Sequence, residues 1–340
     1  MKQLLADAPL PAQQLVDRFQ RRIDYVRISL TDRCNFRCVY CMSEDMTFIP
    51  RQQVLTLEEI YLVAKAFTQL GVKKIRLTGG EPLLRQGAID LMARIAELPG
   101  LDELVLTTNG ALLNEMAPAL KSAGVKRINI SIDSLKPERF KALTRTGDLT
   151  KVLSGIEQAC QQGFERIKLN AVILKGQNDD EVVDLLEFAQ KQQIDISYIE
   201  EMPLGQIQSH HRAQSHFSSQ EVINCISQHY ELLETLEQSA GPSRYWRMPS
   251  HPNTRVGLIS PHSHNFCGSC NRVRVTAEGR LLLCLGNEHS VDLKRMLRSY
   301  PGDLQVLRSA IVEAVQDKPY SHQFDFDDVQ IVRFMNATGG

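Results

Sequence analysis

The sequence has no excess of charge of either sign, because 39 lysines and arginines stand against 40 aspartates and glutamates. This balance argues against a general affinity for nucleic acids or membrane surfaces, although it leaves room for a local basic pocket. The chain also lacks any run that approaches the roughly 18 consecutive apolar residues of a membrane-spanning helix. We therefore expect no nucleic acid and no membrane among its partners.

The first twenty residues lack the uninterrupted apolar core of a signal peptide, since Asp7 and two prolines interrupt them. We expect a cytoplasmic protein in which residues 1–20 form a short lead-in. Disulfides are rare in that compartment, so the eight cysteines are more readily explained as metal ligands or buried thiols. Two of them, Cys160 and Cys225, stand alone in helical patterns, and we expect both in the core.

Six strand-like stretches alternate with helical patterns between residues 25 and 199. Such alternation is typical of a parallel sheet covered by helices. Six units are too few for a closed eight-unit barrel, so the sequence predicts an α/β fold built as an incomplete (β/α)6 barrel of the TIM type. The expected strands cover residues 25–30, 74–78, 104–108, 127–133, 166–174 and 194–199.

Polar segments follow most of these strands. Sites in parallel barrels and open sheets form beyond the carboxyl ends of the strands. We therefore expect one mouth lined by residues 31–41, 79–82, 107–110, 131–133 and 200–203.

The pattern changes after about residue 205. Residues 206–219 are polar and rich in histidine, as in a mobile loop. Shorter strand candidates follow at 256–259, 272–276 and 281–285, and the last two are joined as a hairpin through Glu278 and Gly279. The sequence thus predicts a lead-in over 1–20, a partial barrel over 21–240 and a C-terminal domain over 241–340.

Three thiols lie within a short loop after the first strand, at Cys34, Cys38 and Cys41. Thiolates are the ligands of iron-sulfur clusters, and a 4Fe-4S cluster takes four cysteines, one per iron. With three protein ligands, one iron keeps an open position. A zinc site or incidental buried thiols are the alternatives, but structural zinc prefers four ligands and no fourth is near.

This loop, Cys34-Asn-Phe-Arg-Cys-Val-Tyr-Cys41, together with Gly79-Gly-Glu-Pro82 after the second strand, resembles the radical S-adenosylmethionine superfamily. The resemblance implies that the open iron chelates the amino and carboxylate groups of S-adenosylmethionine. An electron from the cluster then cleaves it to a 5′-deoxyadenosyl radical, chemistry that the cofactor supplies. The diglycine is expected to let the backbone approach the ligand closely.

A second group of three thiols lies at Cys267, Cys270 and Cys284. It could form a second cluster, or a zinc knuckle completed by one histidine. The histidines available for the knuckle are His262, His264 and His289.

The segment Phe266-Cys-Gly-Ser-Cys-Asn-Arg-Val-Arg-Val275 resembles the C-terminal domain of the GTP 3′,8-cyclases of molybdenum cofactor biosynthesis. So do the start, Val26-Arg-Ile-Ser-Leu-Thr-Asp-Arg-Cys34, and the end, Gly339-Gly340. The resemblance implies that a C-terminal iron-sulfur domain covers the barrel mouth. It also implies a second 4Fe-4S cluster whose open iron contacts the guanine of GTP.

In that family the adenosyl radical abstracts the ribose 3′ hydrogen of GTP, and the carbon radical attacks C8 of the base. The product is (8S)-3′,8-cyclo-7,8-dihydroguanosine 5′-triphosphate. The resemblance further implies an external electron donor and a downstream cyclic pyranopterin monophosphate synthase as partners, and a homodimer is compatible with it.

The family's functional residues carry over onto matching positions of this sequence. Those expected to bind S-adenosylmethionine are Tyr40, Gly80, Ser131 and Met202. Those expected to bind GTP are Arg27, Arg76, Thr107, Lys168, Arg272, Val273 and Arg274. Those expected to take part in catalysis are Arg272, Arg274, Gly339 and Gly340. Guanidinium groups suit phosphate oxygens, but each cation could also be a solvated strand-end charge.

One position departs from the family pattern, because Ser197 stands where the family usually has arginine. This departure bears on the prediction that GTP is the substrate more than on the resemblance to the superfamily. A related alternative is a radical enzyme with an auxiliary cluster that acts on a peptide or another small molecule. An alternative of another class is a non-catalytic iron-sulfur or zinc protein that binds nucleotide or senses redox state.

Overall fold

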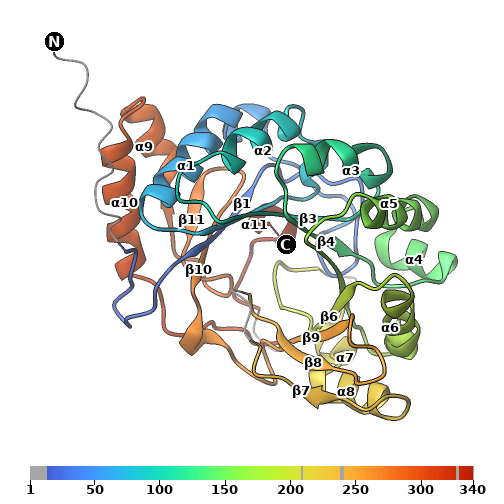
Figure 1. Cartoon of the computed structure of the whole chain (residues 1–340). Coiled ribbons are helices and arrows are strands. Elements are labelled where there is room, and N and C mark those ends of the chain that lie inside the picture. The colour runs from blue at the N-terminus through green and yellow to red at the C-terminus, as the bar shows by residue number, and fades with distance from the viewer. Residues whose placement is uncertain (1–13, 208–209, 238–240, 327–328, 340) are drawn as a thin grey trace.

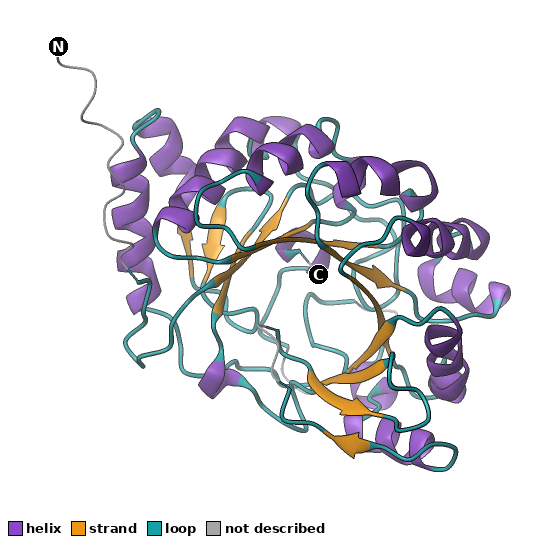
Figure 2. Ribbon diagram, viewed as in Figure 1, coloured by secondary structure: helices purple, strands orange, loops and turns teal. Residues whose placement is uncertain are grey.

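The computed structural model describes residues 14–207, 210–237, 241–326 and 329–339. A curved sheet forms an inner arc, and most of the helices lie on its outer side (Figures 1 and 2). Most of the lead-in, residues 1–13, and the predicted catalytic Gly340 lie outside the described residues. Within the described chain, no helix combines the length and the apolar character needed to cross a membrane.

The six predicted strand and helix units are confirmed. The strands are β1 (Tyr25–Ser29), β2 (Lys74–Thr78), β3 (Glu103–Thr108), β4 (Arg127–Ser131), β5 (Arg166–Val172) and β6 (Asp195–Ile199). The helices between them are α1 (Leu57–Gln69), α2 (Ala88–Ala96), α3 (Leu113–Ser122), α4 (Pro137–Thr144), α5 (Leu149–Gln161) and α6 (Val182–Lys191). A capping box of Thr56 and Glu59 starts α1, because each side chain bonds the backbone N–H of the other.

The later strands extend the same sheet at both edges. β10 (Arg272–Val275) lies parallel to β1, and β9 (Arg255–Ile259) lies parallel to β6. The outer strands are β11 (Arg280–Leu282), β12 (Ser290–Asp292), β8 (Arg244–Arg247) and β7 (Leu233–Glu234). The strand order is β12-β11-β10-β1-β2-β3-β4-β5-β6-β9-β8-β7, so the described strands form an open partial barrel. The predicted hairpin through Glu278 and Gly279 is confirmed as β10 and β11.

Four short helices and one longer helix complete the C-terminal half of the described chain. They are α7 (Arg212–Ser215), α8 (Ser219–Ser227), α9 (Leu293–Ser299), α10 (Leu304–Gln316) and α11 (Met335–Thr338). Turns of 3₁₀ helix cover Arg51–Gln53, Pro82–Leu84, Asp179–Glu181 and Cys267–Ser269. In Figure 1, α11 lies within the arc of the sheet rather than with the outer helices.

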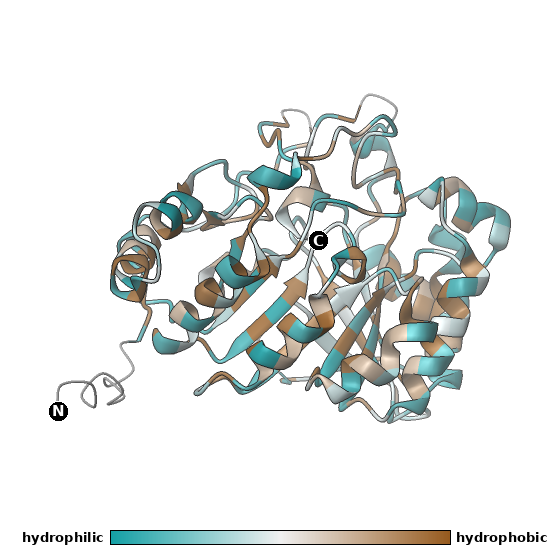
Figure 3. Cartoon of the chain, turned by 90° about the horizontal axis from the view of Figure 1, so that it is seen from above, coloured by the Kyte–Doolittle hydropathy of each residue, from teal (hydrophilic) through white to brown (hydrophobic). Residues whose placement is uncertain are grey.

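Alternation along the strands decides where the core sits. In β1, Val26 and Ile28 belong to the hydrophobic core, whereas Tyr25 and Arg27 line a cavity on the inner side of the sheet. The other central strands follow the same period of two, and hydrophobic and hydrophilic segments alternate along the strands in Figure 3. Cys160 and Cys225 pack against the core from partly buried positions, in keeping with the expectation. The core therefore lies between sheet and helices, and the inside of the barrel stays polar.

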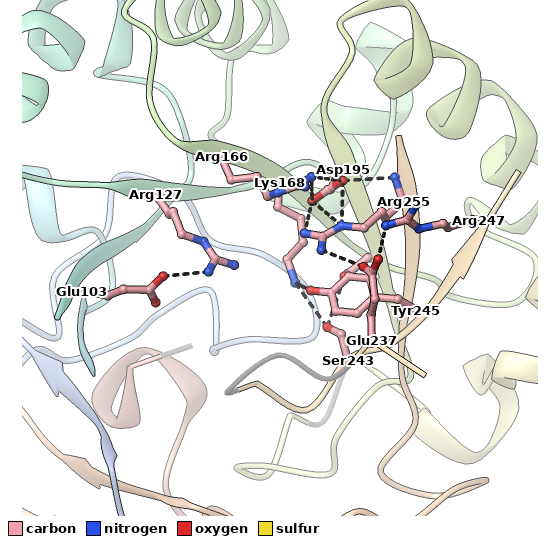
Figure 4. Close-up of polar contacts among 11 residues, drawn as sticks. Glu103, Arg127, Arg166, Lys168, Asp195, Glu237, Ser243, Tyr245, Arg247 and Arg255 are labelled. Carbon is pink, nitrogen blue, oxygen red and sulfur yellow. Dashed lines mark hydrogen bonds and ion pairs between the residues drawn. The ribbon is translucent and has the colours of Figure 1, made fainter. Parts of the chain in front are cut away.

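Asp195 joins three neighbouring strands at the amino end of β6 (Figure 4). Both of its carboxylate oxygens lie 3.1 Å from Nη1 of Arg166 on β5. Arg255 on β9 donates to the same carboxylate from Nη2 at 2.7 Å and from its backbone N–H at 3.0 Å. Only 1% of Asp195 is exposed, so this charge depends on the two arginines for solvation.

Replacing Asp195 with asparagine should lower the free energy of unfolding by about 2 kcal/mol, because Arg255 loses its shorter ion pair and keeps the one with Glu237 at 3.2 Å. Urea unfolding measures the change. The matched control is Asp102→Asn, which removes an exposed pair with Lys73 at 3.8 Å and should cost less than about 1 kcal/mol. Equal losses in the two variants would contradict the role given to Asp195.

Candidate active site

A single cavity inside the barrel gathers residues that are far apart in the sequence. It is lined by both groups of cysteines and by side chains from the carboxyl ends and inner faces of the strands. The predicted residues found on its wall are Cys34, Cys38, Cys41, Cys267, Cys270, Cys284, Tyr40, Gly80, Ser131, Met202, Arg27, Arg76, Thr107, Lys168, Arg272, Val273 and Arg274. Val273 belongs mainly to the hydrophobic core, so its side chain is apart from the polar wall.

The first cysteine group sits in a loop with N–H donors around its sulfur atoms. Cys34 Sγ accepts from the Phe36 backbone at 3.3 Å and from Asn109 Nδ2 at 3.8 Å. Burial raises the pKa of Cys34 to about 11 and that of Cys41 to about 12, and it raises the pKa of Cys38 well above its ordinary value. Burial thus favours the protonated thiols, and a cluster that binds these cysteines as thiolates would have to displace those protons.

The diglycine packs against the first cysteine loop, and its expected approach to the ligand stays a prediction. A Cβ at Gly80 would lie 2.5 Å from the carbonyl oxygen of Arg33 and 2.6 Å from that of Asp32. A Cβ at Gly79 would lie 2.7 Å from the carbonyl oxygen of Thr31. The close approach is therefore to the backbone of the cysteine loop, and the Gly80 N–H donates to the Thr31 carbonyl at 2.7 Å. Because the two glycines have no side chain, their loop can pack directly against the backbone of the cysteine loop.

Glu81 connects the contact between the diglycine and the cysteine loop to the end of β3. Its carboxylate is fully buried and accepts from the backbone N–H groups of Leu83 at 3.0 Å and Asn109 at 2.7 Å. Thr108 Oγ1 donates to it at 2.9 Å. Burial raises the pKa of Glu81 to about 7 although these donors favour the charged form. Asn109, which contacts Cys34, is thus held in place by Glu81.

The second cysteine group lies in a more positive environment. Burial alone would raise the pKa of Cys270, but Arg272 and Lys318 lower it to about 6. Lys318 Nζ also donates to the Arg272 carbonyl at 3.0 Å. Arg21, from the border of the predicted lead-in, donates to the Cys267 carbonyl at 2.8 Å. The two cations thus favour a thiolate at Cys270, whereas burial raises the pKa of Cys284. The Arg21 contact fixes the loop.

Nothing in the described part of the chain gathers three His, Cys, Asp or Glu side chains tightly enough for a single metal ion. His262, one candidate zinc ligand, instead lies 2.9 Å from the Glu201 carbonyl and stacks on Phe326 at 4.2 Å. A 4Fe-4S cluster has a different requirement, because its cysteines bind different irons.

Arginines occupy equivalent positions on three neighbouring strands. The register places Arg274 of β10, Arg27 of β1 and Arg76 of β2 side by side. Strands are about 4.8 Å apart, and like charges directly opposite each other are destabilising. Arg76 Nε donates to Tyr25 OH at 2.7 Å, and its Nη1 donates to Thr107 Oγ1 at 3.0 Å. The register thus brings three guanidinium groups together on the inner wall.

Two further cations of the barrel interior share one carboxylate. Glu103 lies 2.5 Å from Lys74 Nζ and 2.9 Å from Arg127 Nη1. Arg76 and Arg274, by contrast, donate to hydroxyl and carbonyl oxygens. An external anion bound there would compensate their charge.

Tyr25 lies among these cations and is almost fully buried. Burial alone would raise its pKa, but Arg76, Arg27, Lys74 and Arg272 together lower the pKa of Tyr25 to about 7. Burial also lowers the pKa of Arg27 to about 10, and burial with the neighbouring Arg27 and Arg272 lowers the pKa of Arg274. The lowered pKa of Tyr25 and the lowered pKa of Arg274 both reflect the positive charges that surround them.

The residues expected to bind S-adenosylmethionine lie on the wall near the first cysteine group. Tyr40 donates from its hydroxyl to Asp133 Oδ2 at 2.7 Å, and the Val172 N–H donates to Oδ1 of the same carboxylate at 2.8 Å. The Tyr40 hydroxyl therefore already donates its proton to Asp133 in a hydrogen bond. Ser131, Gly80 and Met202 line the cavity beside it.

The polar stretch after β6 is not a loose linker where the structure describes it. Glu201 is buried, and its carboxylate lies 2.7 Å from His210 Nε2 and accepts from Arg212 Nε at 3.0 Å. Ser215 donates to the same group at 3.0 Å. The prediction of a mobile loop is wrong for these residues, because their buried partner follows directly after a barrel strand. These contacts fix the chain beside Met202.

The C-terminal segment lies between the two cysteine groups. Asn336 Nδ2 donates to the Asp32 carbonyl at 2.8 Å, and the Met335 N–H donates to the Cys41 carbonyl at 3.3 Å. The Gly339 carbonyl accepts from Arg274. Gly339 thus meets an arginine beside the second group, while its catalytic role and that of Gly340 stay predictions.

Several residues on the cavity wall were not predicted, among them Tyr25, Lys74 and Lys318. Tyr25 and Lys74 lie two positions before Arg27 and Arg76, so the strand period of two already places each pair on one face. Lys318 follows α10, and no sequence pattern connects it with β10. The periodicity could therefore have found the first two, but only tertiary structure reveals the third.

Comparisons with known proteins agree with this arrangement. Residues 28–189 match the model of the Radical SAM superfamily, and residues 194–324 match the Molybdenum Cofactor Synthesis C family. The GTP 3′,8-cyclase of Pseudomonas entomophila (strain L48) is 63% identical over 96% of this chain and 98% of its own length. That of Pseudomonas fluorescens (strain Pf0-1) is 61% identical over 96% of this chain and 98% of its own length.

A solved structure has the same fold at low sequence similarity. Streptococcus suis SuiB bound to S-adenosylmethionine aligns with a TM-score of 0.61 and 14% identity, covering 87% of this chain and 68% of SuiB. This likeness and the Radical SAM match confirm the predicted fold class.

Replacing Gly80 with alanine should disrupt the first cysteine group, because the new Cβ would meet the Asp32 and Arg33 carbonyls. We expect a large loss of bound iron after anaerobic reconstitution, measured per chain together with the electron paramagnetic resonance signal of the reduced protein. The matched control is Gly268→Ala in the other cysteine loop, where a Cβ meets nothing nearer than 3.7 Å. Full iron binding by Gly80→Ala would refute the packing argument.

Replacing Tyr25 with phenylalanine should change how stability depends on pH. The pKa of Tyr25 is lowered to about 7 from 10.0, so the phenolate stabilises the folded chain. This contribution is complete above about pH 10 and is lost as the pH falls through about 7. Urea unfolding should therefore show a gap between wild type and variant that widens from pH 7 to pH 10. The exposed Tyr300→Phe is the control, and a constant gap for Tyr25→Phe would be the contrary result.

Proposed function

The chain belongs to the family of GTP 3′,8-cyclases, and from this premise we propose that it converts GTP into (8S)-3′,8-cyclo-7,8-dihydroguanosine 5′-triphosphate in molybdenum cofactor biosynthesis. The observation that carries the proposal is one cavity lined by two groups of three cysteines and by a row of arginines, of which Arg76 and Arg274 donate to hydroxyl and carbonyl oxygens. Cysteines alone would also suit a zinc protein, and cations alone would suit any anion-binding protein. Together they suit a radical reaction on a polyanionic nucleotide.

The Radical SAM match implies a 4Fe-4S cluster and S-adenosylmethionine. We infer that Cys34, Cys38 and Cys41 hold this cluster, and that Tyr40, Gly80, Ser131 and Met202 line the place of S-adenosylmethionine. When bound and reduced, the pair supplies a 5′-deoxyadenosyl radical. The protein contributes the fixed loop, the enclosing walls and the position of the nucleotide.

We also propose a second 4Fe-4S cluster on Cys267, Cys270 and Cys284. Support comes from their place on the wall of the same cavity and from the Arg272 and Lys318 charges that favour a Cys270 thiolate. An iron without a protein ligand at this site would be available to the guanine of GTP. Arg272 and Val273 would border that end of the nucleotide.

The cations of the inner wall suit the triphosphate. Guanidinium groups form paired hydrogen bonds with phosphate oxygens, and a lysine adds a compact charge. Arg27, Arg76 and Arg274 lie side by side, and their mutual repulsion is relieved when a polyanion binds between them. Thr107 orients Arg76 and Lys168 lies on the same wall. The Gly339 carbonyl, bonded to Arg274, would place the C-terminal segment over the substrate.

The remaining expectations follow from this function. We propose an external electron donor for the first cluster, and a cyclic pyranopterin monophosphate synthase as the enzyme that consumes the product. A cytoplasmic location, a homodimer and domain boundaries at residues 20 and 240 stay predictions. The sheet passes through both proposed domains, since β9 and β10 pair with β6 and β1.

Anaerobically reconstituted protein tests the function directly. It should bind about eight irons per chain, in two clusters of four. After reduction it should form 5′-deoxyadenosine and, with GTP, the cyclised nucleotide. Arg274→Ala should lower cyclisation about tenfold or more, because a charge-assisted bond to substrate is lost, while cleavage of S-adenosylmethionine without GTP changes little.

The matched control is Arg295→Ala, an exposed arginine on α9. Zinc in place of iron, with no 5′-deoxyadenosine, would disprove radical chemistry. Formation of 5′-deoxyadenosine without a cyclised product from GTP would disprove the substrate. Equal losses of both activities in Arg274→Ala would disprove the role given to that residue.

A further inference from the structure

Lys168 differs from the neighbouring cations in what holds it. Glu103 pairs with Lys74 and Arg127, and Asp195 pairs with Arg166 and Arg255, as Figure 4 shows for most of these residues. Within the described residues, no ion pair involves Lys168. Its Nζ atom lies 3.2 Å from Ser243 Oγ and 3.5 Å from Tyr245 OH.

Both hydroxyls reach Lys168 from outside the six strand and helix units. Ser243 directly precedes β8 and Tyr245 belongs to it, at the far side of β9. β8 pairs antiparallel with β9 and places Tyr245 beside Gly257. The C-terminal half of the chain thereby contributes two groups to the inner wall that the barrel itself does not supply.

The surrounding packing fixes these hydroxyls. Ser243 Oγ lies 3.3 Å from Ser197 Oγ, and both serines are buried. A Cβ at Gly257 would overlap Ser197 Oγ and lie 3.2 Å from Tyr245 Cε1, so a side chain there would displace both. The Arg255 guanidinium lies 4.6 Å from the centre of the Tyr245 ring. Ser197, the position that departs from the family pattern, thus supports this small hydroxyl cluster.

Neutral oxygens can orient an ammonium without cancelling its charge. An ammonium has three N–H donors, so the hydroxyls of Ser243 and Tyr245 leave one donor for a ligand. Burial lowers the pKa of Lys168, and an anion at that donor would favour the charged form. Lys168 also lies on the wall of the cavity with Arg76.

We propose that Ser243 and Tyr245 are positioning residues that aim the Lys168 ammonium at the phosphates of GTP. This role rests on the proposed function and adds a specificity element supplied by β8 and the residue before it. It also gives the Ser197 position a function in this chain, because its hydroxyl holds Ser243 and fits, with the Tyr245 ring, into the space left by Gly257.

The test uses the cluster-loaded protein with the variants Ser243→Ala, Tyr245→Phe and both together. We expect KM for GTP to rise about fivefold in each single variant and about twentyfold in the double variant, because a bond to a charged group is weakened. The value of kcat should change less than about twofold, as expected when binding rather than the transition state is affected. Binding of guanosine, which lacks phosphates, should be unchanged in equilibrium dialysis.

Two controls remove similar groups elsewhere. Tyr230→Phe removes a hydroxyl that donates to Glu187 at 2.8 Å on the exterior, and Ser154→Ala removes one that donates to Asn114 at 3.0 Å. Neither should change KM for GTP. If Ser243→Ala fails to fold, Tyr245→Phe retains the ring and still tests the proposal.

The outcomes separate this role from packing and from the proposed function. An unchanged KM in variants of an enzyme that cyclises GTP overturns the positioning role alone. Equal weakening of GTP and guanosine binding also overturns it, because a packing defect does not distinguish phosphates. A wild-type protein that neither binds nor cyclises GTP overturns the proposed function and this inference with it.

Discussion

The arrangement of the site depends on the alternation of side chains along parallel strands. One set faces the helices and forms the core, and the other lines the inside of the barrel, where Arg274, Arg27 and Arg76 lie side by side. Such a row is unfavourable by itself. The fold tolerates it because apolar burial on the outer face of the same strands stabilises the sheet. The apolar outer face of the sheet therefore stabilises the fold, and the inner face carries the charged residues of the site.

Two loop contacts then connect the cations to the cysteines. Gly79 and Gly80 pack against the backbone of the first cysteine loop, and Lys318 and Arg21 hold the loop of the second. The C-terminal segment touches both sides through Asn336 and Gly339. Both groups are thus supported by backbone carbonyl contacts, which do not depend on the identity of exposed side chains.

Local patterns in the sequence predicted the six central strands, the hairpin of β10 and β11 and the first group of cysteines, because alternation, capping and cysteine spacing are short-range features. The cationic residues of the cavity wall were predicted from the family resemblance. Continuation of the sheet into β9 and β10 could not be predicted, since strand pairing between Tyr25 and Arg272 depends on tertiary structure. The same reason hid Lys318, Ser243 and Tyr245. The diglycine was recognised, but its packing partner was not, because a motif does not say what its backbone touches.

Pairing of β1 with β10 also bears on how the protein folds. β1 lies near the start of the described chain. Its two neighbours in the sheet are β2 and β10, and β10 follows most of the other strands in the sequence. Until then, one edge of β1 presents unpaired backbone groups, which can pair with other chains. Contacts between distant segments slow folding, because the intervening chain must be ordered first. One edge of β1, directly before the loop that carries Cys34, therefore stays unpaired until Arg272–Val275 has joined the sheet.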